Sequence, residues 1–309
     1  MATAERDSPY ALMFHHFTDD RHIAGQGAIT ADRFERILQA VGRDRILSPR
    51  DWMERVATGS LEPHHTCLTF DDALRCQTDV ALPVMSRLGL KAFWFVYSSV
   101  LEGKIERLEV YRYFRTACFD SVDAFYDGFE DCLRDGPYAG KVASALESFD
   151  ADSYLAEFRF YTRGDRRFRY LRDKVLGPDA YFDVMDDMVR RANLDVETLK
   201  PLLWMDPDDV VALHADGHVV GLHSTSHPTA IADMPLEQQL AEYAHNSEHL
   251  TRLIGERPTT VAHPCGSYSA ATLAILRDLG VTLGFRSNRS PVVGRSALKL
   301  PREDHANLP

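Results

Sequence analysis

Short apolar runs alternate with helical segments along most of this 309-residue chain, and this alternation constrains the fold more than any other feature. Repeated strand–helix order is typical of parallel strands joined by right-handed crossovers. The sequence therefore predicts an α/β fold of about seven parallel strands. The expected strands cover residues 11–17, 66–72, 91–97, 219–222, 260–264, 282–286 and 298–302.

Ionisable residues end at least four of these runs, as at His15, Asp71, His223 and His263. Catalytic groups of α/β folds gather at the carboxyl ends of the strands. This pattern favours a closed barrel, with an open sheet as the alternative.

Residues 101–203 follow a different pattern, with helical periodicity, many aromatic and arginine residues, and no convincing strand. We expect one barrel domain over residues 1–309 that carries residues 101–203 as a helical insertion. The insertion covers one side of the site or packs laterally without contacting substrate. Its Arg-rich segment, residues 163–169, is a candidate anion-binding site or a solvated helical face.

The formal net charge of −11 argues against nucleic acid or an anionic membrane as the main partner. No apolar stretch reaches the ~18 residues of a membrane span, so we expect no membrane insertion. The first residues lack the apolar segment of a secretory signal, and a cytoplasmic location is therefore expected. The oligomeric state cannot be predicted from these features.

Two sequence elements carry most of the expected chemistry. Asp71 and Asp72 end one strand, and His223 and His227, four residues apart, follow another. One carboxylate with two neutral imidazoles can bind a divalent transition metal and leave positions open for water and substrate. Zn²⁺ is favoured, with Fe²⁺, Co²⁺ and Ni²⁺ as alternatives. The second carboxylate is then a candidate base.

Three segments resemble the first three motifs of the polysaccharide deacetylase family (carbohydrate esterase family 4). They are Thr69-Phe-Asp-Asp, His223-Ser-Thr-Ser-His and Pro264-Cys-Gly-Ser-Tyr. The resemblance implies a distorted (β/α) barrel, usually with seven strands, that removes N- or O-acetyl groups from sugars. It also implies Asp71 as general base and Asp72, His223 and His227 as metal ligands.

The chain departs from the family pattern at three places, and with the lack of a secretory signal this predicts a divergent, cytosolic subgroup. Ala73 stands where glycine is usual, and Ala262 stands where an arginine normally holds the base. The late family histidine, the general acid, has no clear counterpart. Arg302, Asp304 and His305 near the end of the chain could supply a cation and a carboxylate-oriented imidazole.

Several histidines compete for the role of general acid. We place His305 first, His263 second, and His15 or His16 third. The remaining histidines in polar contexts are expected to be solvated: His64, His65, His214, His218, His245 and His249.

Together these features predict a metal-dependent hydrolase that removes an N-acyl group, such as acetyl, from an amino sugar, nucleotide sugar or glycan precursor. The expected partner is therefore a small-molecule or glycan substrate. Two alternatives stay open: hydrolysis of another C–N bond, such as that of a cyclic amide, and a non-catalytic sugar-binding barrel.

Overall fold

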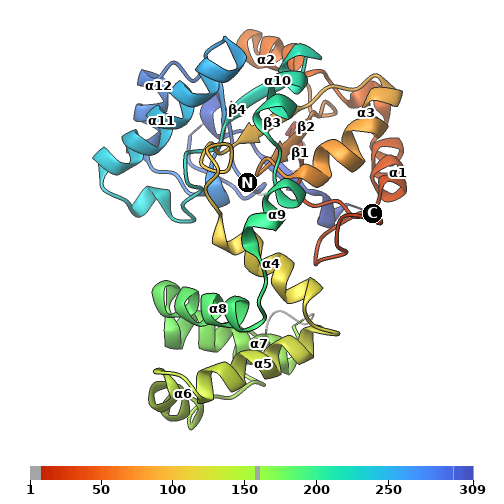
Figure 1. Cartoon of the computed structure of the whole chain (residues 1–309). Helices are drawn as coiled ribbons and strands as arrows, with labels where there is room; N and C mark the ends of the chain where they lie inside the picture. The colour runs from red at the N-terminus through yellow and green to blue at the C-terminus, as the bar shows by residue number, and fades with distance from the viewer. Residues whose placement is uncertain (1–7, 157–160, 295, 309) are drawn as a thin grey trace. The chain divides into compact units, whose positions relative to one another are not determined.

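The computed structural model describes residues 8–156, 161–294 and 296–308. The chain divides into two compact units (Figure 1). The barrel unit comprises Met1–Glu106 and Thr198–Pro309, and the helical unit comprises Arg107–Glu197. Most of the N-terminal segment discussed above lies outside the described residues. That the whole chain acts as one domain with an insertion stays a prediction.

A sheet of seven parallel strands forms the centre of the barrel unit, in the order β6-β5-β4-β3-β2-β1-β7. A parallel bridge between Phe285, at the end of β6, and Leu300, just before β7, brings the two edges of the sheet together. The predicted distorted (β/α) barrel is therefore confirmed. The strands are β1 (Ala11–Phe14), β2 (Leu68–Asp71), β3 (Phe93–Val96), β4 (Val219–Leu222), β5 (Thr260–Ala262), β6 (Leu283–Phe285) and β7 (Arg302–Asp304).

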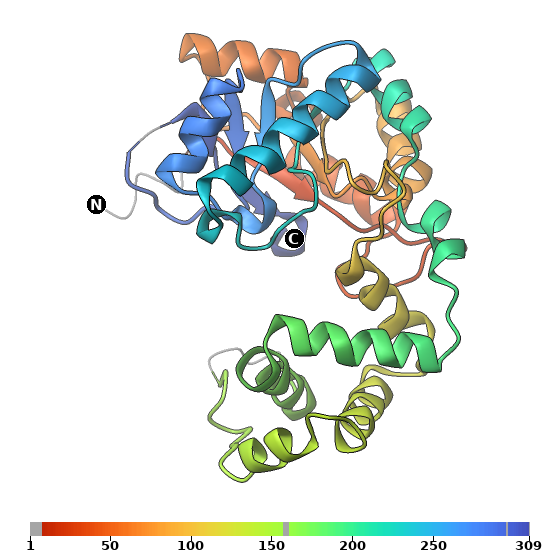
Figure 2. The same ribbon diagram turned by 60° about the vertical axis from the view of Figure 1, so that its left-hand side comes forward.

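Helices lie outside these strands, and the long helix α11 runs along the outer face of the sheet (Figure 2). Several of these helices start with a polar N-cap residue whose side chain accepts a hydrogen bond from a backbone N–H of the first turn. These N-cap residues are Thr30, Ser48, Asp206 and Ser269. The helices of this unit are α1 (Ala31–Val41), α2 (Pro49–Thr58), α3 (Leu82–Leu88), α10 (Pro207–Ala215), α11 (Leu236–Ile254) and α12 (Ala270–Asp278).

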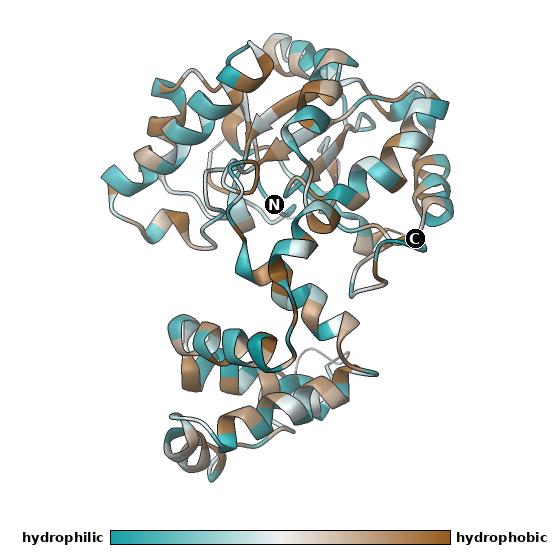
Figure 3. Ribbon diagram, viewed as in Figure 1, coloured by the Kyte–Doolittle hydropathy of each residue, from teal (hydrophilic) through white to brown (hydrophobic). Residues whose placement is uncertain are grey.

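The strands of the barrel are buried along nearly their whole length, and they stand out as apolar among more polar helices (Figure 3). This is the pattern expected when helices cover a parallel sheet. Stacked rings fill the interior next to β2, where Phe70 lies 4.4 Å from Trp94 and 5.5 Å from Phe14 between ring centroids. A rigid apolar core thus supports the strand ends.

The last predicted strand, residues 298–302, is wrong in its position. Residues Ala297–Lys299 form a 3-10 turn, and the strand runs instead over Arg302–Asp304. The apolar alternation at Leu298 and Leu300 reflects burial beside β6 rather than strand pairing with β1. The displacement matters because it places Arg302 inside the sheet.

The helical unit has a core made of aromatic and aliphatic side chains. Phe168 lies at its centre, with Phe125, Phe129 and Tyr126 within 5.4 Å between ring centroids. The unit contains α4 (Arg107–Ala117), α5 (Val122–Arg134), α6 (Ala139–Leu146), α7 (Arg163–Tyr170) and α8 (Pro178–Arg191), and α9 (Val196–Leu203) leads back to the barrel unit.

Arginines of the predicted Arg-rich segment make ion pairs within the helical unit. Arg167 binds Glu130 at 2.5 Å, and Arg163 lies 3.1 Å from Asp152. These contacts favour a structural role for the segment over an anion site. Among the described helices, none is long and apolar enough to cross a membrane.

Candidate active site and metal centre

Asp72, His223 and His227 converge on one point at the carboxyl ends of β2 and β4. The Oδ1 atom of Asp72 lies 3.2 Å from Nε2 of His223 and 3.3 Å from Nε2 of His227. The three ligand atoms lie within 4.8 Å of one another. Segments more than 150 residues apart in the chain thus supply the carboxylate and imidazole pair that a divalent transition metal requires.

The surroundings of His223 fix which ring nitrogen faces Asp72. Its Nδ1 lies 2.8 Å from the carbonyl oxygen of Ala262, and a carbonyl can only accept, so Nδ1 carries the proton. Nε2 is thereby turned toward Asp72. Burial lowers the pKa of His223, but Asp71 and Asp72 outweigh it and raise the pKa, so a cation bound there would take the place of a proton on Nε2. A backbone carbonyl on the second nitrogen is the usual support of a metal-binding histidine.

The charges at this point also fit a cation. The Oδ1 atom of Asp72 is buried and has no hydrogen-bond partner within the described chain. Burial raises the pKa of Asp72, but His227, His223 and His15 outweigh it and hold the pKa far below its usual range. A buried, ionised and unsatisfied carboxylate oxygen beside two imidazole nitrogens is a donor set that a divalent cation would satisfy.

Asp71 forms a buried ion pair with an arginine from the other end of the chain. Its Oδ1 accepts a hydrogen bond of 2.7 Å from a guanidinium nitrogen of Arg302, and both side chains are almost fully buried. Arg302 also donates to the backbone oxygen of Arg286 and to Oγ1 of Thr69. Burial raises the pKa of Asp71, yet Arg302, His223 and His15 together lower it.

This pair accounts for the missing arginine of the third motif. Residue 262 lies on β5 and is alanine, whereas Arg302 reaches Asp71 from β7, which is separated from β2 only by β1. The sequence analysis offered Arg302 as a source of a cation, and the structure places it against Asp71.

His15 lies beside the free oxygen of Asp71. Its Nε2 is 3.8 Å from Oδ2 of Asp71, and its side chain keeps 27% of its surface exposed. Desolvation lowers the pKa of His15, partly offset by Asp72 and Asp71. Of the proposed acid candidates, it is the one that the described structure places in contact with the Asp71 carboxylate.

His263 and His305 have other partners. Nε2 of His263 bonds to the carbonyl of Leu298 at 2.8 Å, and its ring packs on Tyr268. Nε2 of His305 lies 3.0 Å from the carbonyl of Gly27, and the His305 ring stacks on Phe14. Asp304 lies 3.4 Å from Nδ1 of His305, so the expected carboxylate–imidazole pair is present.

Helix α11 contributes residues to the site that the sequence analysis missed. Glu242 accepts hydrogen bonds from the backbone N–H groups of Thr225 and Ser226, and Asn246 accepts from the N–H of His223. These residues hold the loop between His223 and His227. Buried polar residues at helical spacing on α11 (Gln239, Tyr243, Asn246) were the signal that could have found them.

Two histidines expected to be solvated are buried, so that prediction was wrong for them. His218 is 3% exposed, and its Nδ1 accepts N–H bonds from Ala92 and from the Trp94 indole. His65 is 7% exposed and accepts the backbone N–H of Glu62. Their polar sequence neighbours hid the fact that each imidazole accepts a hydrogen bond inside the fold.

The backbone at this end of the barrel is unusual. Five non-glycine residues have φ between 51° and 78°: Asp72, Ala73, Ser224, His227 and Cys265. All of them follow β2, β4 or β5. Ala73 has a φ of 51°, a region that is strained for residues with a Cβ, and this is a physical reason for the glycine that the family resemblance implies at this position.

Comparison with known proteins gives one family match. Residues 179–284 match the family model described as polysaccharide deacetylase. That segment includes His223 and His227 but not the Asp71 motif. No curated protein matches the chain.

Several solved structures share the fold. The deacetylase PplD of Streptococcus pyogenes, in complex with acetate, has a TM-score of 0.56 at 16% identity, covering 96% of this chain and 91% of that one. IcaB from Ammonifex degensii has a TM-score of 0.56 at 15% identity over the same shares. A de-N-acetylase from Aggregatibacter actinomycetemcomitans has 0.55 at 12%, covering 95% and 93%.

The family match supports carbohydrate deacetylation as the general activity, and the solved structures add the shared barrel fold. The resemblance of this chain to the polysaccharide deacetylase family is thus confirmed, by a sequence match over residues 179–284 and by its fold.

Proposed function

We propose that this protein is a metal-dependent hydrolase that removes an N-acyl group, such as acetyl, from an amino sugar, nucleotide sugar or glycan precursor. The convergence of Asp72, His223 and His227 beside the Asp71–Arg302 pair carries the proposal. It joins the donor set of a catalytic metal to an ionised carboxylate, the two requirements of amide hydrolysis.

Asp72, His223 and His227 would hold the metal. When bound, a divalent cation supplies Lewis-acid polarisation of an acyl carbonyl and lowers the pKa of water. Two features support this assignment. Oδ1 of Asp72 is buried without a hydrogen-bond partner, and the bond from Nδ1 of His223 to Ala262 turns Nε2 toward that oxygen.

Asp71 would act as the general base. Arg302 occupies Oδ1 and orients the carboxylate, so Oδ2 is the atom left to accept a proton from the attacking water. Because the pKa of Asp71 is lowered, the group is ionised at neutral pH and ready to accept. Arg302 is a positioning residue that keeps the buried carboxylate charged.

His15 would act as the general acid, in the role that the sequence analysis gave first to His305. Its Nε2 lies 3.8 Å from Oδ2 of Asp71, beyond hydrogen-bond distance. A proton taken up by Asp71 would reach His15, and then the leaving nitrogen, once the imidazole moves within hydrogen-bond distance. The lowered pKa of His15 makes the neutral ring the resting form, which requires such a supply. Oriented imidazoles contribute roughly 10²–10⁴-fold to such reactions.

The test measures acetate release from N-acetylglucosamine oligomers by the purified chain with Zn²⁺ or Co²⁺. Asp71→Asn and His227→Ala should each abolish release, and His15→Ala should lower kcat by roughly 10²-fold or more. The neighbouring His16→Ala is the matched control and should stay within a few-fold of the parent.

The alternatives give different results in the same assay. Opening of cyclic amides without acetate release would replace the proposed substrate class. Sugar binding without turnover, unchanged by His227→Ala, would favour a non-catalytic barrel. Loss of activity in His305→Ala rather than His15→Ala would return the acid role to His305.

A further inference from the structure

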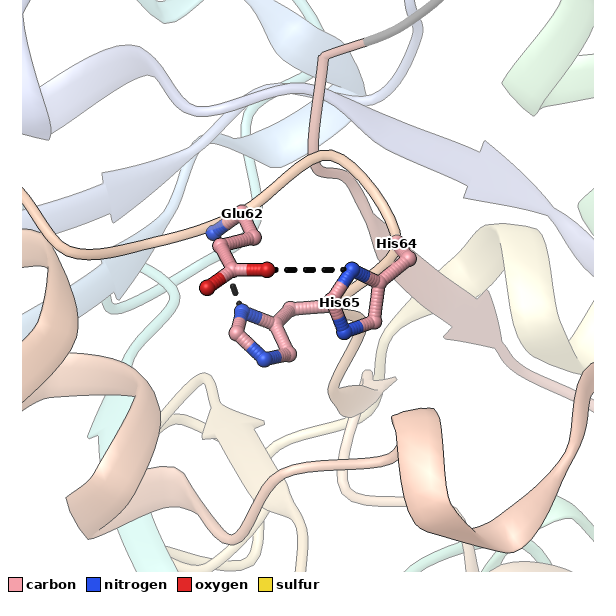
Figure 4. A group of neighbouring side chains, drawn as sticks. All are labelled: Glu62, His64 and His65. Atoms are coloured by element: carbon pink, nitrogen blue, oxygen red, sulfur yellow. Dashed lines mark hydrogen bonds and ion pairs between the residues drawn. The ribbon is translucent and has the colours of Figure 1, made fainter.

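Outside the proposed active site, two further groups of carboxylate and imidazole side chains could hold a metal ion among the described residues. One is formed by Glu62, His64 and His65 on a single turn (Figure 4). There, Nδ1 of His65 already accepts the backbone N–H of Glu62 at 2.9 Å. That turn therefore offers fewer free ligand atoms than its composition suggests.

The other group joins two separate elements of the barrel unit. Glu102 lies in the loop after β3, and His245 and His249 lie four residues apart on α11. Residues at this spacing share one face of a helix and can bind one ion together. The Oε1 atom of Glu102 lies 2.5 Å from Nε2 of His245 and 3.1 Å from Nδ1 of His249.

This arrangement repeats that of the active site. In both groups one carboxylate oxygen meets one nitrogen from each of two histidines four residues apart, with separations of 2.5–3.3 Å. We propose that Glu102, His245 and His249 form a second site for a divalent transition metal such as Zn²⁺ or Co²⁺. Two imidazoles and one carboxylate match the ligand preference of these ions.

The surroundings of the group suit an ion that exchanges with solvent. The side chains of Glu102 and His249 are about one-fifth exposed, and that of His245 is half exposed. Lys104 lies 3.7 Å from the other carboxylate oxygen, Oε2, and leaves Oε1 to the histidines. Open positions remain for water, as in an accessible site.

The site would connect two segments that support the active-site loop. Ser99, in the same loop as Glu102, donates its backbone N–H to the carbonyl of Thr225. On α11, Asn246 is adjacent to His245 and accepts the N–H of His223. An ion held by Glu102 and the two histidines would therefore fix both supports of the residues 223–227 loop, and it would stabilise the native state because only that state brings the ligands together.

The experiment counts bound metal in the full chain after dialysis against Zn²⁺ or Co²⁺ and measures Tm with and without the ion. His227→Ala disables the active-site group, so this variant should still bind one equivalent and should show a Tm that rises with added metal. His227→Ala/His245→Ala should bind none. His227→Ala/His64→Ala is the matched control and should still bind one equivalent of metal.

Glu102→Gln in the His227→Ala background is a second test, because glutamine has nearly the same size and shape as glutamate. This substitution should weaken metal binding at least about tenfold. The proposal is overturned if His227→Ala binds no metal, or if its equivalent survives His245→Ala or is lost with His64→Ala instead. An outcome in which the parent binds a single equivalent that His245→Ala removes would support this site while counting against the active-site metal.

Discussion

The barrel unit and the helical unit bury different kinds of side chain. Every buried polar or charged side chain among the described residues belongs to the barrel unit, including Asp71, Arg302, His223 and His263. The buried core of the helical unit consists of aromatic, aliphatic and sulfur-containing side chains such as Phe129 and Met185. All 13 histidines of the sequence also lie outside Arg107–Glu197.

The difference indicates that the barrel unit buries groups that lower its stability but can take part in catalysis. A buried charge costs several kcal/mol of desolvation, and a buried ion pair seldom stabilises more than a well-packed apolar pair. A chain selected only for stability would fill both units in the same way. The gathering of Asp71, Asp72 and His223, with shifted pKa values, at one end of the barrel is therefore an argument for function there.

The largest effect is expected when the Asp71–Arg302 pair is broken. Arg302→Met should lower the free energy of unfolding by about 3–5 kcal/mol, because the Asp71 carboxylate is left buried without its partner. Urea unfolding followed by circular dichroism measures the change. The double variant Asp71→Leu/Arg302→Met should regain most of the stability but none of the activity. A single variant as stable as the parent would contradict the buried-pair interpretation.

A smaller effect is expected from acidification of the barrel unit. Burial lowers the pKa of His218 to about 4, so the folded state favours the neutral ring. The unfolded chain takes up a proton near pH 6.5, so the stabilising contribution is complete above that pH and is lost as pH falls toward 4. The loss is about 3 kcal/mol for this group.

Unfolding free energies at pH 7.0, 5.5 and 4.5 measure this dependence. His218→Leu should be less stable than the parent at pH 7, since the Ala92 and Trp94 donors lose their acceptor, and it should show a flatter pH dependence. An identical pH slope in parent and variant would assign the acid sensitivity to other groups.

The smallest effect is expected in the core of the helical unit. Met185 is fully buried there, and Met185→Leu should cost less than about 1.5 kcal/mol because volume and polarity are nearly conserved. Acetate release should stay unchanged. A cost as large as that of Arg302→Met would remove the contrast between the two units.

The sequence predicted the fold and the convergence of Asp72, His223 and His227 because both follow from local patterns. Apolar runs separated by helices define parallel strands, and parallel strands bring their carboxyl ends to one rim, so Asp72 and His223 could be expected to meet. The separation of 3.2 Å between them agrees with that expectation.

The rest depends on how the barrel closes, which no local pattern shows. The pairing of β7 with β1 brings Arg302 to Asp71, although the two residues lie 231 positions apart. The same closure places His305 against Gly27 and leaves His15 beside Asp71. The burial of His218 was missed for a similar reason, since its partners come from β3 and the residue before it.

The left-handed backbone at Asp72, Ala73, Ser224, His227 and Cys265 has a consequence for protein engineering. The left-handed conformation of each such residue costs roughly 1–2 kcal/mol in an isolated chain. A short peptide with the same sequence would therefore prefer another backbone conformation. The short motifs alone would therefore not form this site in another protein. A graft onto another scaffold would succeed only if the supporting strands and α11 were transferred together with the motifs. Ala73→Gly would be the first substitution to make, because it removes the strain at that residue.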